Sequence, residues 1–238
     1  MSSWEREKDK YLKMRADEKH KNSISLEKIP TWKHMSESEK LPNPVKKMDN
    51  CPIDASLNEK LAEKISIFEG DITKLAIDAI VNAANSSLQG GGGVDGAIHR
   101  AAGSFLKLEG ATLAPCKTGD AKITGGYQLP AKYVIHTVGP RLDRGQLENS
   151  HVRLLENCYS NSLQLLVSKN LRSIAFPCIS TGIYGYPNLP AAHTAAYEVR
   201  KFLEKEHTKV DRVIFCLFLQ QDKQIYREVL QSYFPPSH

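Results

Sequence analysis

Two asparagines, an aspartate and four consecutive glycines lie within one short stretch of this 238-residue chain and could together hold an anionic ligand. Asn82 and Asn85 follow a short apolar run, and Asp95 follows the glycines of residues 90–93. Glycines let backbone N–H groups approach a ligand closely, and a helix expected from Val94 onward would direct its positive N-terminal dipole at the same place. The stretch therefore predicts a phosphate-binding loop with polar side chains beside it.

A second glycine-bearing loop, residues 180–185, also follows an apolar run and precedes a helical pattern. Loops that follow parallel strands meet at the carboxyl edge of an α/β sheet, where such sheets bind their ligands. We therefore expect one elongated ligand to contact both loops.

The glycine run alone is also typical of a flexible tight turn. It is not a Walker A loop, because no Gly-Lys-Ser/Thr follows, and it lacks the Gly-x-Gly-x-x-Gly pattern of dinucleotide-binding folds. Five scattered cysteines without a Cys-x-x-Cys pair indicate a reducing compartment and no metal site. The net charge of +5 is too mild to favour nucleic-acid binding, and no apolar run reaches the roughly 18 residues of a membrane span.

These loops need a sheet and helices to hold them. Apolar runs predict strands at residues 65–68, 79–82, 121–124, 133–137, 173–177 and 212–219. Apolar residues at helical spacing predict helices at residues 94–105, 147–169, 191–205 and 222–233. Strands that alternate with helices indicate an α/β fold whose mostly parallel or mixed sheet lies between helices.

Residues 1–60 differ from the rest of the chain, because charges alternate there with isolated apolar anchors and four prolines interrupt any long helix. We expect a helix near residues 4–21 and then an extended arm against the main domain. The chain is thus predicted to consist of a charged, partly helical N-terminal extension, residues 1–60, and one domain, residues 61–238.

Several motifs, taken in order, resemble those of a macrodomain. The general likeness lies in Asn82-Ala-Ala-Asn, in Gly90-Gly-Gly-Gly-Val-Asp-Gly and in Ser180-Thr-Gly-Ile-Tyr-Gly. The MacroD-type branch of ADP-ribose hydrolases is similar at Gly70-Asp-Ile-Thr and at Phe176-Pro-Cys-Ile-Ser-Thr-Gly. The resemblance covers roughly residues 61–235.

The resemblance implies a three-layer α/β/α sandwich with a mixed central sheet. It implies binding of ADP-ribose, removal of mono-ADP-ribose from acidic side chains of modified proteins, and deacetylation of O-acetyl-ADP-ribose, with no cofactor and no metal. The expected partners are these nucleotides and mono-ADP-ribosylated proteins, bound by a monomer that contacts neither membrane nor nucleic acid. The expected setting is the nucleus and cytoplasm, with a part in the DNA damage response, and the mitochondrion is left open.

Carried over residue by residue, the resemblance makes Asp95 the catalytic acid and assigns the distal ribose hydroxyls to Asn85, which shares in catalysis. Asp71 matches the acceptor of the adenine amino group, and Phe218 matches the residue that packs on the adenine ring. The implied substrate-binding residues are Gly70, Asp71, Ile72, Ala83, Ala84, Asn85, Gly90, Gly91, Gly92, Gly93, Val94, Asp95, Ile179, Ser180, Thr181, Gly182, Ile183, Tyr184, Gly185 and Phe218.

Some of these residues also suit purely structural roles. Asp71 would serve as a helix cap after Gly70, and Phe218 would serve in the core. His99 lies one helical turn beyond Asp95 and could orient it, although a structural histidine is the favoured interpretation.

Three further residues are assigned supporting roles. Asn82 is expected to support the glycine loop from beneath, and His136 and Cys178 are assigned to the core. The rival function is a module that binds ADP-ribose without cleaving it. Asp95 distinguishes the two, since a binding module needs the loops but no carboxylate at the scissile end. A nucleic-acid or phosphoesterase domain is disfavoured by the absence of a metal-ligand cluster in the sequence.

Overall fold

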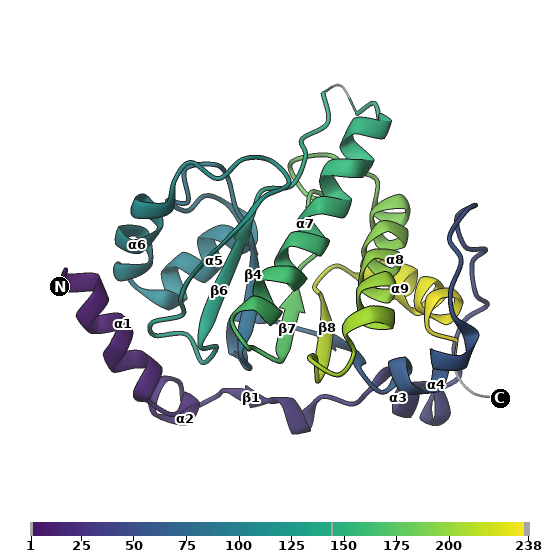
Figure 1. The fold of residues 1–238 in the computed structure, drawn as a ribbon, viewed down its shortest axis with the longest axis horizontal. Helices are drawn as coiled ribbons and strands as arrows, with labels where there is room; N and C mark the ends of the chain where they lie inside the picture. The colour runs from purple at the N-terminus through teal and green to yellow at the C-terminus, as the bar shows by residue number, and fades with distance from the viewer. Residues whose placement is uncertain (1, 144, 236–238) are drawn as a thin grey trace.

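The computed structural model describes residues 2–143 and 145–235 and arranges them in three layers (Figure 1). The central sheet has the strand order β2-β8-β7-β4-β6-β5. Neighbouring strands are parallel except for the antiparallel pair β5 and β6. Its strands are β2 (Ile65–Glu69), β4 (Ala79–Ala83), β5 (Ala121–Gly125), β6 (Tyr133–Thr137), β7 (Ser173–Phe176) and β8 (Arg212–Leu217). The predicted mixed sheet is therefore confirmed.

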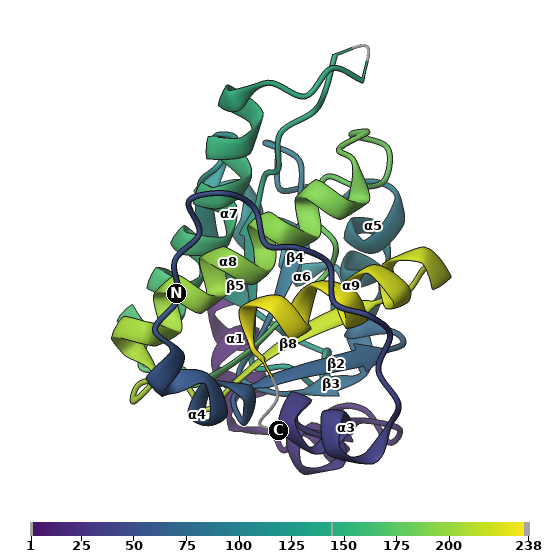
Figure 2. The ribbon, with the colours of Figure 1, turned by 90° about the vertical axis from the view of Figure 1, so that its right-hand side faces the viewer.

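Helices cover both faces of this sheet. One face packs against α7 (Asn149–Ser168), α8 (Asn188–Glu206) and α9 (Gln220–Tyr233), and α8 and α9 lie side by side there (Figure 2). The other face packs against α5 (Gly93–Ala102) and α6 (Phe105–Leu113). A large buried apolar cluster lies on each face of the sheet, between it and the helices, and this confirms the three-layer sandwich.

Two predicted boundaries are wrong for identifiable reasons. The helix expected over residues 94–105 ends at Ala102, because Gly103 has a φ of +85° and closes α5 with its N–H donated to the His99 carbonyl. The chain then starts α6, which the sequence analysis did not separate. The strand expected to reach residue 219 ends at Leu217, and the two residues that follow it are exposed.

The N-terminal extension runs along one edge of the molecule, from α1 on one side to α3 and α4 on the other (Figure 1). Its elements are α1 (Ser3–Lys13), α2 (Ala16–Lys19), β1 (Ile24–Ser25), α3 (Trp32–Ser38) and α4 (Asn58–Ala62). The single helix predicted near residues 4–21 is divided, because Met14 and Arg15 adopt extended backbone angles. The predicted boundary at residue 60 falls inside α4, and β1 pairs with β3 (Leu75–Ala76) of the main domain.

The contacts that fix the extension to the domain include those of Trp32 and Lys8. Trp32 is completely buried, and its indole N–H donates a 2.9 Å hydrogen bond to the carbonyl of Phe234. Lys8 forms a 2.5 Å ion pair with the buried carboxylate of Glu109 on α6. Within the described ranges, no helix is both long and apolar enough to cross a membrane.

We expect Trp32→Ala to lower the free energy of unfolding by about 3–5 kcal/mol, because it leaves a cavity in the core and an unpaired carbonyl. The matched control is Trp4→Ala, which removes the half-buried tryptophan of α1 and should cost at most about 1 kcal/mol. Urea denaturation of the full chain measures both losses. Equal losses would show that the segment around Trp32 is not part of the domain core.

Candidate active site

A cavity of about 740 Å³ lies at the carboxyl ends of the parallel strands. Its walls come from the segments that follow β2, β4, β6, β7 and β8, and from the first turns of α5 and α9. Parallel α/β sheets place their ligand sites at this edge, because loops of several strands converge there. Both glycine-bearing loops identified in the sequence border this one cavity.

Most of the predicted substrate-binding residues line the cavity, and three do not. Gly90 lies beneath the first loop, where its carbonyl accepts the Asn85 amide and its backbone rests against the His99 ring. Ile179 is buried in the core. Gly185 is exposed and turns the second loop with a φ of +72°, donating its N–H to the Gly182 carbonyl. These three residues do not line the cavity, and their part in substrate binding stays a prediction.

Asp95 lies in the first turn of α5 and is 4% exposed. Its Oδ1 accepts a 2.8 Å hydrogen bond from Asn82 Nδ2 and lies 3.4 Å from His99 Nε2. Its Oδ2 accepts no hydrogen bond from residues 2–143 or 145–235 and faces Gly91, where an added Cβ would be 3.0 Å away. Oδ1 is therefore held by Asn82 from the sheet side, and Oδ2 is available to a ligand in the cavity.

A close backbone approach sets this arrangement. A Cβ at Gly96 would lie 2.5 Å from the carbonyl oxygen of Gly91, so only glycine lets the loop fold back across the first turn of α5. The loop thereby covers Asp95 and presents its own backbone to the cavity.

Asn85 organises the loop as well as lining the cavity. Its Oδ1 accepts hydrogen bonds from the backbone and hydroxyl of Ser87, at 3.1 and 2.6 Å, and its Nδ2 donates to the Gly90 carbonyl at 3.1 Å. A carboxamide nitrogen carries two hydrogens, so one remains for a ligand hydroxyl. The sequence analysis did not foresee the structural part of this role.

At the other end of the cavity, Asp71 is the helix cap considered for it and also keeps one carboxylate oxygen free. Its Oδ1 accepts hydrogen bonds from the backbone and hydroxyl of Thr73, at 2.9 and 2.7 Å, and so caps the short helix Ile72–Lys74. Within the described parts of the chain its Oδ2 receives no hydrogen bond, and the residue is exposed at the cavity. Phe218 is 79% exposed, so the alternative of core packing is wrong.

The second loop holds a strained serine. Ser180 has a φ of +67°, unusual for a residue with a side chain, and its buried hydroxyl has no partner in the described protein. A Cβ on Gly139 would overlap this hydroxyl, which explains the glycine at the end of that segment. Backbone strain and an unpaired buried donor are typical of a site that is completed by a ligand.

Several lining residues were missed by sequence reasoning. Cys178, assigned to the core, lines the cavity together with Cys216 and Asp222. Burial and the nearby Asp222 raise the pKa of the Cys178 thiol well above its usual value, and burial raises the pKa of Cys216 to about 12. Both sulfurs are therefore protonated and are poor nucleophiles. The remaining lining residues outside the prediction are Ala97, Gly139, Pro177 and Leu219.

The histidines beneath the cavity are uncharged near neutral pH. Burial, reinforced by His99, lowers the pKa of His136 to about 3. Burial also lowers the pKa of His99, against the opposing effect of Asp95. The described residues contain no group of three or more His, Cys, Asp or Glu side chains that could hold a metal ion. The cavity is lined by the carboxylates of Asp71, Asp95 and Asp222, and neutral imidazoles lie beneath Asp95.

The depressed pKa of His136 predicts an acid-sensitive fold. An unfolded histidine titrates near pH 6.5, whereas the folded state accepts no proton until about pH 3, so acid favours the unfolded state. This stabilisation is complete above pH 6.5 and is lost as the pH falls towards 3. Between pH 7 and 5, His136 should account for about 2 kcal/mol of the lost unfolding free energy. Urea titrations should show that loss to be smaller by this amount in His136→Asn; an unchanged pH dependence would contradict it.

The comparisons with known proteins agree on one family. A family model described as Macro domain matches residues 81–195. The chain is 52% identical over 235 residues to the ADP-ribose glycohydrolase MACROD2 of Xenopus laevis. The aligned region covers 98% of this chain and 55% of that protein. It is also 53% identical over 168 residues to a Macro domain-containing protein of Chlorobaculum tepidum. That aligned region covers 71% of this chain and 96% of that protein.

Solved structures give the same result. The crystal structure of a Trypanosoma brucei macrodomain in complex with ADP-ribose superposes with a TM-score of 0.75 at 36% identity and covers 96% of this chain and 90% of that one. This chain spans about half the length of the MACROD2 proteins that it matches, namely 55% in Xenopus laevis and 49% in Mus musculus.

Proposed function

Because this chain belongs to the macrodomain family, we propose that it is a hydrolase that binds ADP-ribose and removes mono-ADP-ribose from acidic side chains of modified proteins. The observation that carries this proposal is Asp95, a buried carboxylate with one oxygen fixed by Asn82 and the other directed to the cavity. Relatives named as ADP-ribose glycohydrolases support hydrolysis over binding alone.

The proposed ligand extends across the whole cavity. The free oxygen of Asp71 accepts the adenine amino group, and the exposed ring of Phe218 packs against the base. The diphosphate lies between the two loops, near the N-terminus of α5 and the unpaired hydroxyl of Ser180. The distal ribose then meets Asn85 beside Asp95. The ADP-ribose complex of the Trypanosoma brucei macrodomain supports this choice of ligand.

The proposed reaction adds water to the anomeric or ester carbon of the substrate, which releases ADP-ribose and a free side-chain carboxyl group. Asp95 takes the water's proton as general base, or it orients a water that the substrate's own phosphate deprotonates. Asn85 holds the distal ribose so that the reacting carbon faces that water. The same addition to the acetyl ester of O-acetyl-ADP-ribose gives acetate and ADP-ribose, so one site serves both substrates.

The proposal extends to the setting in which the protein works. We propose that it acts as a monomer on mono-ADP-ribosylated proteins, without contacting nucleic acid or membranes directly. The five cysteines are all free thiols, which supports a reducing compartment such as the nucleus or cytoplasm. A part in the DNA damage response and delivery to the mitochondrion stay open predictions.

Asp95→Asn keeps the size of the side chain and removes its negative charge. We expect this variant, like Asp95→Ala, to bind ADP-ribose within about tenfold of wild type while its turnover falls by about 10²–10⁴. Single-turnover release from a glutamate-linked mono-ADP-ribosylated protein, with calorimetry on the same samples, measures both quantities. Near-normal release by the variants would remove Asp95 from the mechanism, and no release by wild type would favour the binding module.

Gly182 offers a test of the binding loops. It lines the cavity with open space around it, so Gly182→Glu should fold and should place a negative side chain where we expect the diphosphate. We expect affinity for ADP-ribose to fall at least tenfold through exclusion and charge repulsion. The control Gly182→Ala should stay within about threefold of wild type, because a methyl group meets no neighbour. Undiminished affinity in a folded Gly182→Glu protein would contradict the two-loop site.

A further inference from the structure

A buried polar chain continues from Asp95 into the sheet. The Nδ2 of Asn82 on β4 lies 2.8 Å from Asp95 Oδ1 and 3.1 Å from His136 Nδ1 on β6. On the far side of the imidazole, His136 Nε2 lies 2.9 Å from the hydroxyl of Thr124 on β5, and that hydroxyl also lies 3.1 Å from the Gly125 carbonyl. Asn82, Thr124 and His136 are each completely buried.

Only one arrangement of protons satisfies the hydrogen bonds of this polar network. A carboxylate only accepts hydrogen bonds, so the amide group of Asn82 must direct one hydrogen to Asp95. Its other hydrogen then meets His136 Nδ1, which must be an unprotonated acceptor. The imidazole hydrogen is therefore on Nε2 and is donated to Thr124, whose own hydrogen goes to the Gly125 carbonyl. Each group in the chain fixes the orientation of the next.

The orientation of Asn82 has a cost, which indicates that it is imposed. Its carbonyl oxygen is buried without a hydrogen-bond partner in the described structure. Reversing the carboxamide would instead place this oxygen 2.8 Å from Asp95 Oδ1, where two acceptors repel. With its hydrogen on Nε2, His136 has none on Nδ1 to offer to a reversed carbonyl oxygen, and this also disfavours the reversal. An unsatisfied buried polar atom of this kind is rare in folded proteins and is common where function requires the geometry.

We propose that His136 is a positioning residue of the hydrolytic site. Held as the Nε2–H tautomer by Thr124, it locks the carboxamide of Asn82, which in turn holds Asp95 Oδ1 and keeps Oδ2 directed at the cavity. The inference rests on the proposed function, because it assigns His136 to the reaction of Asp95. His136 itself does not reach the cavity, so its effect on substrate passes through Asn82 and Asp95.

Two titratable side chains lie close to this network: Glu109 accepts the Gly125 N–H at its far end, and His99 lies beside Asp95. The His99 ring on α5 lies 6.2 Å from the His136 ring, and its Nε2 is 3.4 Å from Asp95 Oδ1. That separation is long for a hydrogen bond, and neither ring nitrogen of His99 has another partner there. The shorter contact from Asn82 therefore fixes Asp95, and His136 fixes Asn82.

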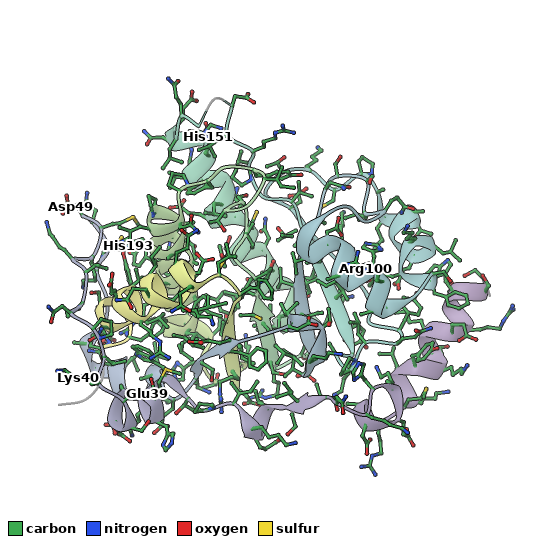
Figure 3. All side chains as sticks on the ribbon, turned by 180° about the vertical axis from the view of Figure 1, so that it is seen from behind. Glu39, Lys40, Asp49, Arg100, His151 and His193 are labelled. Atoms are coloured by element: carbon green, nitrogen blue, oxygen red, sulfur yellow. The ribbon has the colours of Figure 1, made fainter. Side chains whose placement is uncertain are left out.

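The first experiment compares three variants of the full chain in release of ADP-ribose from a mono-ADP-ribosylated protein. His136→Leu removes the acceptor, so kcat should fall about 10- to 100-fold while the Kd for ADP-ribose stays within threefold. His136→Asn places an oxygen where Nδ1 was and should recover part of that loss. The matched control is His193→Leu on α8, which removes a buried histidine that is hydrogen-bonded to Tyr233. His193 lies on the opposite side of the sheet from α5, the helix that carries Arg100 (Figure 3).

The control should lose stability and keep kcat, because His193 has no contact with Asp95. If a folded His136→Leu protein keeps wild-type kcat, or loses no more than His193→Leu, the proposal is overturned. If His136→Leu does not fold, Thr124→Val replaces it. That change removes the group that fixes the tautomer and should lower kcat, whereas Thr124→Ser should preserve it; equal kcat in these two variants would also overturn the proposal.

A second measurement is independent of turnover. Long-range ¹H–¹⁵N correlation NMR spectra of the histidine side chains in the ¹⁵N-labelled protein should show His136 as the neutral Nε2–H tautomer at every pH from 5 to 9. A protonated ring or an Nδ1–H tautomer would overturn the inference even if the enzyme is active. A wild-type chain that releases no ADP-ribose but shows the expected tautomer would instead count against the proposed function, so the two failures are distinguishable.

Discussion

The site depends on keeping one carboxylate buried without burying an isolated charge. Asp95 is 4% exposed, and the cost of removing a carboxylate from water is large unless hydrogen bonds and dipoles compensate it. The first turn of α5 supplies a favourable dipole, and Asn82 supplies a direct hydrogen bond. Gly96 then lets the glycine loop cover the carboxylate, so the backbone that is expected to bind phosphate also shields the side chain proposed to be catalytic.

A second buried carboxylate, Glu109, is compensated by groups of the sheet and of the N-terminal extension. Glu109 on α6 is buried, and its carboxylate accepts hydrogen bonds from the Gly125 backbone and the Tyr127 hydroxyl while Lys8 of α1 neutralises it. Gly125 closes β5 next to Thr124, the residue that fixes the tautomer of His136. The extension thus anchors the strand from which the polar chain towards Asp95 begins.

The sequence predicted those parts of the fold and site that depend on local pattern. Alternating strands and helices, and glycine loops after strands, follow from spacing along the chain, so the cavity edge was predictable. The link from Asp95 through Asn82 to His136 was not, because Asn82 and His136 lie 54 positions apart and meet only through the pairing of β4 with β6. Cys178 was likewise taken for a core residue, since an apolar run does not indicate which thiol borders a cavity.

In the function proposed for this protein, binding and catalysis are carried by different kinds of groups. The loops present backbone donors together with Nδ2 of Asn85 and Oδ2 of Asp71, so their contribution depends on the backbone path and on side chains that leave the cavity clear. Asp95 acts through its side chain, and its position is determined by buried side chains on β4 and β6. A change in the buried chain should therefore affect the rate while leaving the affinity, because ligand contacts lie on the loops and the reacting carboxylate is held by the sheet. Conversely, a negative side chain at Gly182 should weaken binding without disturbing the protons that fix Asp95, because nothing lies within 4 Å of a Cβ added there. Under the proposed function, the same loops would form a binding module without the carboxylate and its supporting side chains, and a hydrolase with them.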